Sequence, residues 1–133
     1  MEIREYTEYK EDEILRLYSE AGWVSYTNDP QALKKGFENS LLILAAYENG
    51  ELLGLIRTVG DGATVVFIQD ILVFPDKQRL GIGTALLKAV LDRFGNVRQI
   101  ELTTDNTDKT KAFYRSAGFA EFSDIGCCGF MKV

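Results

Sequence analysis

The stretch LVFPDKQRLGIGTALL, residues 72–87, decides the fold of this chain. An apolar, strand-like run stops at a proline, and a helix begins around two glycines, Gly81 and Gly83. Glycine costs a helix about 1 kcal/mol relative to alanine. The first four amides of a helix, however, have no internal partner and lie at the positive end of its dipole. Glycines there let an anion approach the backbone, and Lys77 and Arg79 add positive charge, so the stretch predicts a phosphate-binding loop.

The same glycines would also suit a tight turn or close packing of the helix on a sheet. Two common phosphate motifs do not fit the stretch. The P-loop requires lysine and then serine or threonine after its last glycine, whereas Gly83 is followed by Thr84 and Ala85. The dinucleotide fingerprint requires a small residue where Leu86 stands.

Composition places the chain among ordinary globular proteins. It has 133 residues, 46% hydrophobic and 26% charged, which predicts one domain with a proper core. No apolar run approaches the roughly 20 residues of a membrane helix, and the charged N-terminus lacks a signal-peptide pattern, so a cytoplasmic location without a membrane partner is expected. A net charge of -5 argues against a nucleic-acid partner.

The absence of histidine excludes Ser-His-Asp and Cys-His nucleophilic chemistry and most zinc sites. The two cysteines, Cys127 and Cys128, are adjacent, which is not the spacing of metal ligands or of a disulfide framework. We therefore expect no metal and two reduced packing residues. Residues 76–115 carry eight basic and five acidic side chains, a net of +3 in an acidic protein. This suits a small anionic ligand, although chance clustering on solvated helix faces gives the same count.

The remaining elements follow from periodicity and turn chemistry. A strand over residues 2–7 is followed by a helix around Ile14 and Leu17, and a second helix begins at Asp29-Pro30. The pair Asn49-Gly50 predicts a hairpin between two strands. TVVFIQDILVFP, residues 64–75, is too apolar for a wet face and predicts a central fourth strand covered on both sides.

After the helix that begins near Gly81, QIELTTD at residues 99–105 predicts a fifth strand. Thr107 is expected to cap a fourth helix that Gly118 ends, and the tail, residues 120–133, is expected to supply one or two final strands. The order β-α-α-β-β-β-α-β-α-β is mixed α/β, and the helical crossover makes strands four and five parallel. Ligands of such sheets commonly bind at the carboxyl ends of the strands, where residues 72–87 lie.

At this point the residues resemble a known family. Gln78-Arg79-Leu80-Gly81-Ile82-Gly83 is similar to the Q/R-x-x-G-x-G/A motif of the GNAT superfamily of acyl-CoA N-acyltransferases, and FYRSAGF at residues 113–119 resembles its second signature. Val73-Phe74-Pro75 resembles the family's usual strand ending. The resemblance covers essentially the whole chain. It implies the GNAT fold: a mostly antiparallel mixed sheet, parallel strands four and five splayed around the cofactor, and four helices.

The resemblance implies acetyl-CoA as co-substrate. Its pyrophosphate would lie on the amides from Arg79 to Thr84, and its pantetheine arm would pair with the backbone of strand four near Leu72 and Phe74. Where the family often has asparagine at the start of the last helix, this chain has Thr107, so the cofactor contact falls to Asn106 or Thr107. The cofactor residues implied are Leu72, Val73, Phe74, Gln78, Arg79, Leu80, Gly81, Ile82, Gly83, Thr84, Asn106 and Thr107.

Tyr114 matches the tyrosine whose hydroxyl, in the family, protonates or hydrogen-bonds the departing sulfur. A phenol with a pKa near 10 can protonate a thiolate whose acid has a pKa near 8.5 only slightly uphill; packing of two neighbouring aromatics is the alternative. A carboxylate could take the proton of the amine. Gln69-Asp70 interrupts an apolar strand, so Asp70 must be paired or face a wet cavity, and we favour it over Glu101 on strand five.

Trp23 and Tyr26, with Gln69, could form the wall of an acceptor pocket, although such aromatics are more often core. The resemblance predicts an N-acetyltransferase that moves the acetyl group to a primary amine, on a small molecule or a protein, by direct attack. A homodimer is a further expectation from the family. The alternative is a catalytically silent coenzyme A-binding regulatory or interaction module of the same fold, and an unrelated phosphate-binding domain is a third reading.

Overall fold

A computed structural model describes the whole chain, residues 1–133. The chain separates into two compact units, Met1–Thr103 and Thr104–Val133. That the chain forms a single domain stays a prediction.

The N-terminal unit contains a five-stranded sheet with the strand order β1-β2-β3-β4-β5. The first three pairings are antiparallel, and β4 pairs with β5 in parallel. This confirms the predicted mixed, mostly antiparallel sheet and the parallel fourth and fifth strands. The strands are β1 (Glu2–Glu5), β2 (Leu42–Glu48), β3 (Glu51–Gly60), β4 (Val65–Val73) and β5 (Gln99–Leu102).

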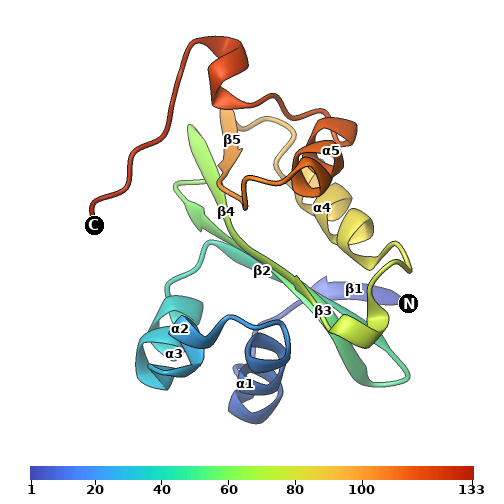
Figure 1. Cartoon of the computed structure of the whole chain (residues 1–133). Coiled ribbons are helices and arrows are strands. Elements are labelled where there is room, and N and C mark those ends of the chain that lie inside the picture. The colour runs from blue at the N-terminus through green and yellow to red at the C-terminus, as the bar shows by residue number, and fades with distance from the viewer. The chain divides into compact units, whose positions relative to one another are not determined.

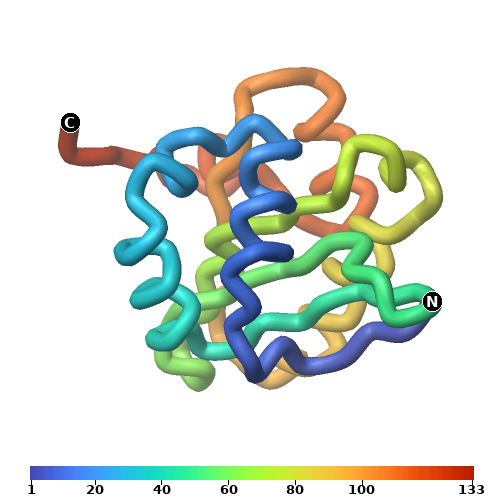
Figure 2. The backbone as a smooth tube through the Cα atoms, turned by 90° about the horizontal axis from the view of Figure 1, so that it is seen from below, coloured from blue at the N-terminus to red at the C-terminus, as the bar shows by residue number.

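Helices cover both faces of this sheet (Figure 1). One face carries α1, α2 and α3, and the other carries α4. Figure 2, seen from the side of α1 to α3, shows α1 crossing in front of the strands. Of the predicted helices, three lie in this unit; α2 is a fourth, which the sequence did not predict. The helices are α1 (Glu11–Glu20), α2 (Val24–Thr27), α3 (Pro30–Glu38) and α4 (Ile82–Arg93).

Local chemistry sets the boundaries of these elements as expected. The Asp29 side chain accepts a hydrogen bond from the Ala32 amide, and Pro30 occupies the first turn of α3. Between β2 and β3, Asn49 and Gly50 both have positive φ, 53° and 78°, which is the backbone of a two-residue hairpin turn.

The core has one layer on each face of the sheet. On the side of α1 to α3, aromatic and aliphatic side chains such as Tyr18, Phe37 and Leu55 form a single buried cluster. On the other side, α4 buries Ile82, Leu86, Leu87 and Val90. The first of these, Ile82, anchors the beginning of α4, so the glycine-containing stretch is held at the edge of a packed layer.

The prediction that β4 is covered on both faces is confirmed in part: α1 and α4 contact the strand from opposite faces, but one residue, Gln69, is exposed. Burial alternates along the strand, with Val66 and Ile68 buried, Phe67 half-buried and Gln69 exposed. One reason is that β5 pairs with β4 only from Val65 to Ile68, so the second half of the strand lacks a neighbour on that side.

The C-terminal unit contains α5 (Asp108–Ser116) and a 3-10 helix, η2 (Phe122–Ile125). Thr107 caps α5, and Gly118 has a φ of 96°, so both predicted ends of this helix are confirmed. The predicted tail strands are wrong. Glu121 and Asp124 form a reciprocal capping box, and Gly126 at φ 81° ends the turn, which commits the segment to a helical turn.

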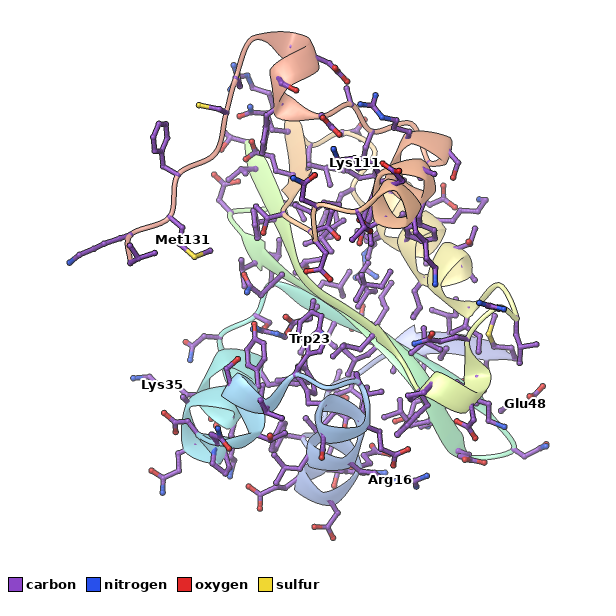
Figure 3. The ribbon with its side chains drawn as sticks, in the orientation of Figure 1. Arg16, Trp23, Lys35, Glu48, Lys111 and Met131 are labelled. Carbon is purple, nitrogen blue, oxygen red and sulfur yellow. The ribbon has the colours of Figure 1, made fainter.

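Beyond Gly126 the chain runs out as an extended segment that carries the labelled Met131 (Figure 3). Phe130 and Met131 are 96% and 80% exposed, so these apolar side chains are not part of the core. No helix in the chain is both long enough and apolar enough to cross a bilayer.

Candidate active site

The polar pair Gln69-Asp70 lies at a β-bulge in β4. Arg57 of β3 is opposite Asp70, whereas the next residue of β3, Thr58, is opposite Ile68. Gln69 is therefore an extra residue without a partner on β3, and a bulge of this kind redirects side chains locally. Both Gln69 and Asp70 contact the hydroxyl of Tyr26 on α2. The bulge thus turns two successive polar side chains toward the face covered by α1, α2 and α3.

These side chains belong to a connected group that we call the Asp70 cluster. Asp70 Oδ2 accepts hydrogen bonds from Arg57 Nε at 2.7 Å and from the Tyr18 hydroxyl at 2.7 Å. Asp70 Oδ1 accepts from the Tyr26 hydroxyl at 3.0 Å, and that hydroxyl accepts from Gln69 Nε2 at 3.0 Å. The cluster therefore consists of Tyr18, Tyr26, Arg57, Gln69 and Asp70.

The inner part of the cluster is inaccessible to solvent. Asp70 is 1% exposed and Arg57 is 6% exposed, so their ion pair is buried. The expectation that Asp70 would be paired is confirmed. Arg57 Nη1 also donates to the Ser40 hydroxyl at 3.2 Å, and the guanidinium carbon lies 5.5 Å from the centroid of the Phe37 ring. A buried pair of this kind persists only when hydrogen bonds satisfy the remaining polar atoms.

Electrostatics in the cluster keep its tyrosines protonated. Burial raises the pKa of the Tyr18 hydroxyl, and the Asp70 charge raises it further. Burial also raises the pKa of Tyr26. Burial alone would lower the pKa of Arg57, but the adjacent Asp70 carboxylate outweighs it and the net direction is upward. Both phenols therefore remain hydrogen-bond donors to Asp70 at neutral pH.

Two aromatic rings form a wall beside the bulge. The rings of Trp23 and Tyr26 are stacked, with centroids 5.8 Å apart and an interplanar angle of 21°. Both side chains are half-exposed, and Trp23 lies on the side of the sheet that carries α1 to α3 (Figure 3). The structure thus brings together Tyr26, Gln69 and Asp70, with Trp23 stacked on Tyr26.

Past the bulge, one edge of β4 is free. β5 ends its pairing at Ile68, whereas β4 continues to Val73. The Phe74 amide donates to the Leu53 carbonyl of β3 at 3.0 Å. Because backbone groups alternate in direction along an antiparallel strand, this contact leaves Ile71 and Val73 facing the free edge.

The carbonyl of Val73 accepts a hydrogen bond from the side-chain amide of Gln78 at 3.4 Å. Of the three residues expected near the pantetheine arm, only Val73 therefore has backbone groups at the free edge. Leu72 and Phe74 are 3% and 5% exposed, and both belong to the core cluster. The adjacent residue whose backbone faces the free edge is Ile71.

The loop that follows β4 presents a row of backbone amides. From Arg79 to Thr84, no backbone or side-chain acceptor of the protein is bonded to an amide, and we call this segment the amide loop. Two of its residues, Arg79 and Gly81, have positive φ of 66° and 81°. A non-glycine residue in this region is strained and is often found at functional sites. The loop thus combines a helix N-terminus with a distorted backbone, which suits an anion.

Glu101 occupies β5 directly opposite Phe67 of β4. Directly paired residues share one face of a sheet, and alternation places Phe67 on the same face as Gln69. Glu101 is half-buried, and no ion pair or hydrogen bond engages its carboxylate. It is therefore a free carboxylate on the face of the sheet that also carries the Gln69 side chain.

The remaining predicted site residues lie in the C-terminal unit. Tyr114 is half-buried on α5. Its ring packs edge-on against the rings of Phe113 and Phe119, with centroid distances of 5.0 and 5.9 Å. Burial raises the pKa of the Tyr114 hydroxyl, and no hydrogen bond engages it. The Thr107 hydroxyl accepts from the Thr110 amide at 3.2 Å as the helix cap, while Asn106 is exposed.

Sequence analysis did not identify three residues of this site: Tyr18, Ser40 and Arg57. Arg57 carried a signal, because it is a charged residue inside the apolar run of β3, thirteen positions before Asp70. Tyr18 carried none, since nothing in the sequence distinguishes it from the other core residues of α1. The structure contains no group of three or more histidine, cysteine, aspartate or glutamate side chains placed to hold a metal ion.

Comparison with known proteins identifies the family to which this chain belongs. The family model of the GNAT acetyltransferase domain matches residues 5–128. The chain therefore belongs to the GNAT acetyltransferase family, which confirms the resemblance carried by its two motifs.

Individual relatives agree with this assignment. A GNAT-family acetyltransferase from Streptococcus pneumoniae TIGR4 is 37% identical, with a TM-score of 0.89 over 99% of this chain and 96% of that one. The ribosomal-protein-S18-alanine N-acetyltransferase of Escherichia coli shares the fold at 22% identity, with a TM-score of 0.76 over 90% and 77% of the two chains. The uncharacterized N-acetyltransferase ycf52 of Pyropia yezoensis is 24% identical over 84% of this chain; the match spans 66% of its length, just under two thirds.

Proposed function

We propose that this protein is an acetyl-CoA-dependent N-acetyltransferase that moves an acetyl group to a primary amine by direct attack. The observation that carries the proposal is the amide loop, Arg79–Thr84, which follows the free edge of β4 after one 3-10 turn, Pro75–Lys77. Six unbonded amides at a helix N-terminus suit a pyrophosphate, and Ile71 and Val73 at the free edge suit the amide groups of a pantetheine arm.

The reaction requires the protein to polarise the thioester carbonyl, to protonate the departing thiolate and to accept a proton from the amine. A backbone N–H at the free edge of β4 would polarise the thioester carbonyl. The amine nitrogen would form its bond to the carbonyl carbon as the carbon–sulfur bond breaks. The Tyr114 hydroxyl would donate its proton to the departing thiolate, which its raised pKa allows because the phenol stays protonated across the neutral range.

The amine must also lose a proton. An alkylamine with a pKa near 10 is about one part in a thousand free base at pH 7, so a nearby carboxylate that takes the proton would help. Asp70 and Glu101 are the two candidates. Asp70 is buried, and its two oxygens already accept three hydrogen bonds. Glu101 has a free carboxylate, so it is the better proposal for the proton acceptor.

Thiol release from acetyl-CoA across a panel of primary amines tests the proposed function. Calorimetric titration with coenzyme A is measured alongside. Binding together with amine-dependent release supports the enzyme. Binding without release for any amine would indicate the silent coenzyme A-binding module, and absence of both would overturn the assignment of the amide loop.

A further inference from the structure

The hydrogen bonds of the Asp70 cluster have one possible direction. Arg57 can only donate, and a carboxylate can only accept. The Tyr18 and Tyr26 hydroxyls each have a single proton, and both lie within hydrogen-bond distance of Asp70, at 2.7 and 3.0 Å. Each tyrosine hydroxyl therefore donates its one hydrogen bond to Asp70.

The direction of these hydrogen bonds also determines how Gln69 must be oriented. Once the Tyr26 hydroxyl donates to Asp70, it can only accept from the Gln69 side chain, which lies 3.0 Å away. The group of Gln69 that faces Tyr26 must then be its NH₂, because the amide oxygen has nothing to donate. The buried charge of Asp70 thus fixes which way the exposed amide of Gln69 is turned, and its oxygen, Oε1, is left free.

The free Oε1 of Gln69 belongs to an exposed side chain beside the free edge of β4. Gln69 is exposed, at the bulge where pairing with β5 stops and the free edge of β4 begins. Its partner Tyr26 carries the stacked Trp23 ring. A hydrogen-bond acceptor beside an aromatic wall suits a ligand that combines an N–H donor with an apolar or aromatic body.

We propose that Gln69 Oε1 accepts a hydrogen bond from the acceptor amine and that Asp70 is a positioning residue that sets the orientation of this amide through Tyr26. The inference rests on the proposed function and names its substrate class: a primary amine whose nitrogen is joined to an apolar or aromatic group that packs on Trp23 and Tyr26. Asp70 cannot meet the amine itself, since it is 1% exposed and already accepts three hydrogen bonds.

Benzylamine is the probe, because it joins a primary amine to an aromatic ring. It is titrated calorimetrically into the full chain, alone and with coenzyme A present. Gln69→Met keeps the length of the side chain and removes the acceptor, so affinity is expected to fall at least tenfold. Gln31→Met, at an exposed glutamine of α3, is the matched control and is expected to change nothing.

The positioning role is tested by non-additivity. Tyr26→Phe and Asp70→Asn are each expected to weaken benzylamine binding several-fold by freeing the Gln69 amide to rotate. The double variant is expected to bind no more weakly than the weaker single variant, because both changes interrupt the same chain of hydrogen bonds. Where benzylamine is turned over, these changes are expected to raise its KM and leave the KM for acetyl-CoA unchanged.

Several results would overturn the inference. These are benzylamine binding that is absent in the parent, binding within twofold of the parent in Gln69→Met, or fully additive losses in the double variant. Should Asp70→Asn fail to fold, Gln69→Met and Tyr26→Phe, both at accessible side chains, still decide the outcome. Benzylamine binding together with no thiol release for any amine of the panel would contradict the proposed function and leave the Gln69 contact standing, so the two failures are distinguishable.

Discussion

The Asp70 cluster and the amide loop both interrupt apolar sequence with polar groups. The polar groups of the cluster are hydrogen-bonded within the protein, whereas the amides of the loop are not. In the cluster, every oxygen of Asp70 is engaged and the ion pair with Arg57 is sealed from solvent. In the loop, six consecutive amides from Arg79 to Thr84 have no protein partner. Residues 71–78, which contain the second half of β4 and a 3-10 turn at Pro75–Lys77, separate Asp70 from the amide loop along the chain.

The difference separates two kinds of polar residue. Buried groups that are fully paired hold the bulge and its side chains in one arrangement, and removing one partner leaves a charge without compensation. Amides without a protein partner at a helix N-terminus can bind an anion. Changes to the buried pair of Arg57 and Asp70 should therefore act first on stability, and changes in the loop should act on ligand affinity.

The largest expected effect is on stability, from Arg57→Met. This change leaves Asp70 as an unpaired buried charge, so the free energy of unfolding should fall by about 3–5 kcal/mol. Urea unfolding followed by circular dichroism measures the change. Arg98→Met, at an exposed arginine of the same unit, should stay within about 0.5 kcal/mol of the parent. Adding Asp70→Leu to Arg57→Met should restore part of the loss, and a loss below about 1 kcal/mol in the single variant would contradict the pairing.

Much of the fold was predictable because it follows from local chemistry. The Asn49-Gly50 turn, the Asp29 cap and the Thr107 cap each depend on residues within four positions, and the structure confirms all three. The tail strands could not be judged in this way, because a strand needs a partner that the sequence does not name. Phe130 and Met131 are apolar residues typical of a strand, yet no neighbouring strand pairs with them. Helix α2 was missed because four residues are too short for a periodic pattern.

The candidate site was predictable only in part, for a related reason. The polar pair Gln69-Asp70 was visible as a break in an apolar run, so the sequence indicated where a partner was needed. It could not identify Tyr18 as a partner, because that contact spans 52 positions and depends on how α1 packs on the sheet. The bulge itself was also hidden, since it becomes visible only in the pairing register between β3 and β4.

Tyr114→Phe gives the next largest effect and concerns a hydroxyl that, like the loop amides, has no partner in the protein. Removing the proton donor for the thiolate should lower kcat at least tenfold, within the 10²–10⁴-fold range typical of general-acid assistance or just below it. Stability and coenzyme A affinity should not change. Burial raises the pKa of Tyr114, so the parent should show no loss of kcat to deprotonated phenol up to about pH 10. Steady-state rates within twofold of the parent would leave Tyr114 as a packing residue.

Gly83→Val tests the amide loop directly. A β-branched side chain beside the unbonded amides should weaken coenzyme A binding at least tenfold, about 1.4 kcal/mol, while the fold is kept because valine is the better helix former. Calorimetric titration measures the affinity. Gly81→Val is a poorer test, since φ is 81° there and valine would be strained without any ligand. Unchanged affinity in a folded Gly83→Val protein would remove the loop as the pyrophosphate site.

The smallest effect should come from Tyr9→Phe, which separates a buried hydroxyl without a partner from one with a partner. Tyr9 packs its ring edge-on against Phe37 at 5.1 Å, and its hydroxyl is buried with no hydrogen bond. Removing a buried group of this kind recovers its desolvation penalty, so stability should rise by up to about 1 kcal/mol.

The same chemical change at Tyr18 should have the opposite sign. Its hydroxyl donates to the Asp70 carboxylate at 2.7 Å, and a hydrogen bond to a charged group contributes about 1.5–3 kcal/mol. Urea unfolding of Tyr9→Phe and Tyr18→Phe side by side therefore measures what pairing adds to burial, with the deleted atom held constant. A clear loss of stability in Tyr9→Phe would mean that its hydroxyl has a partner, and equal changes in the two variants would mean that Tyr18 contributes nothing to holding Asp70.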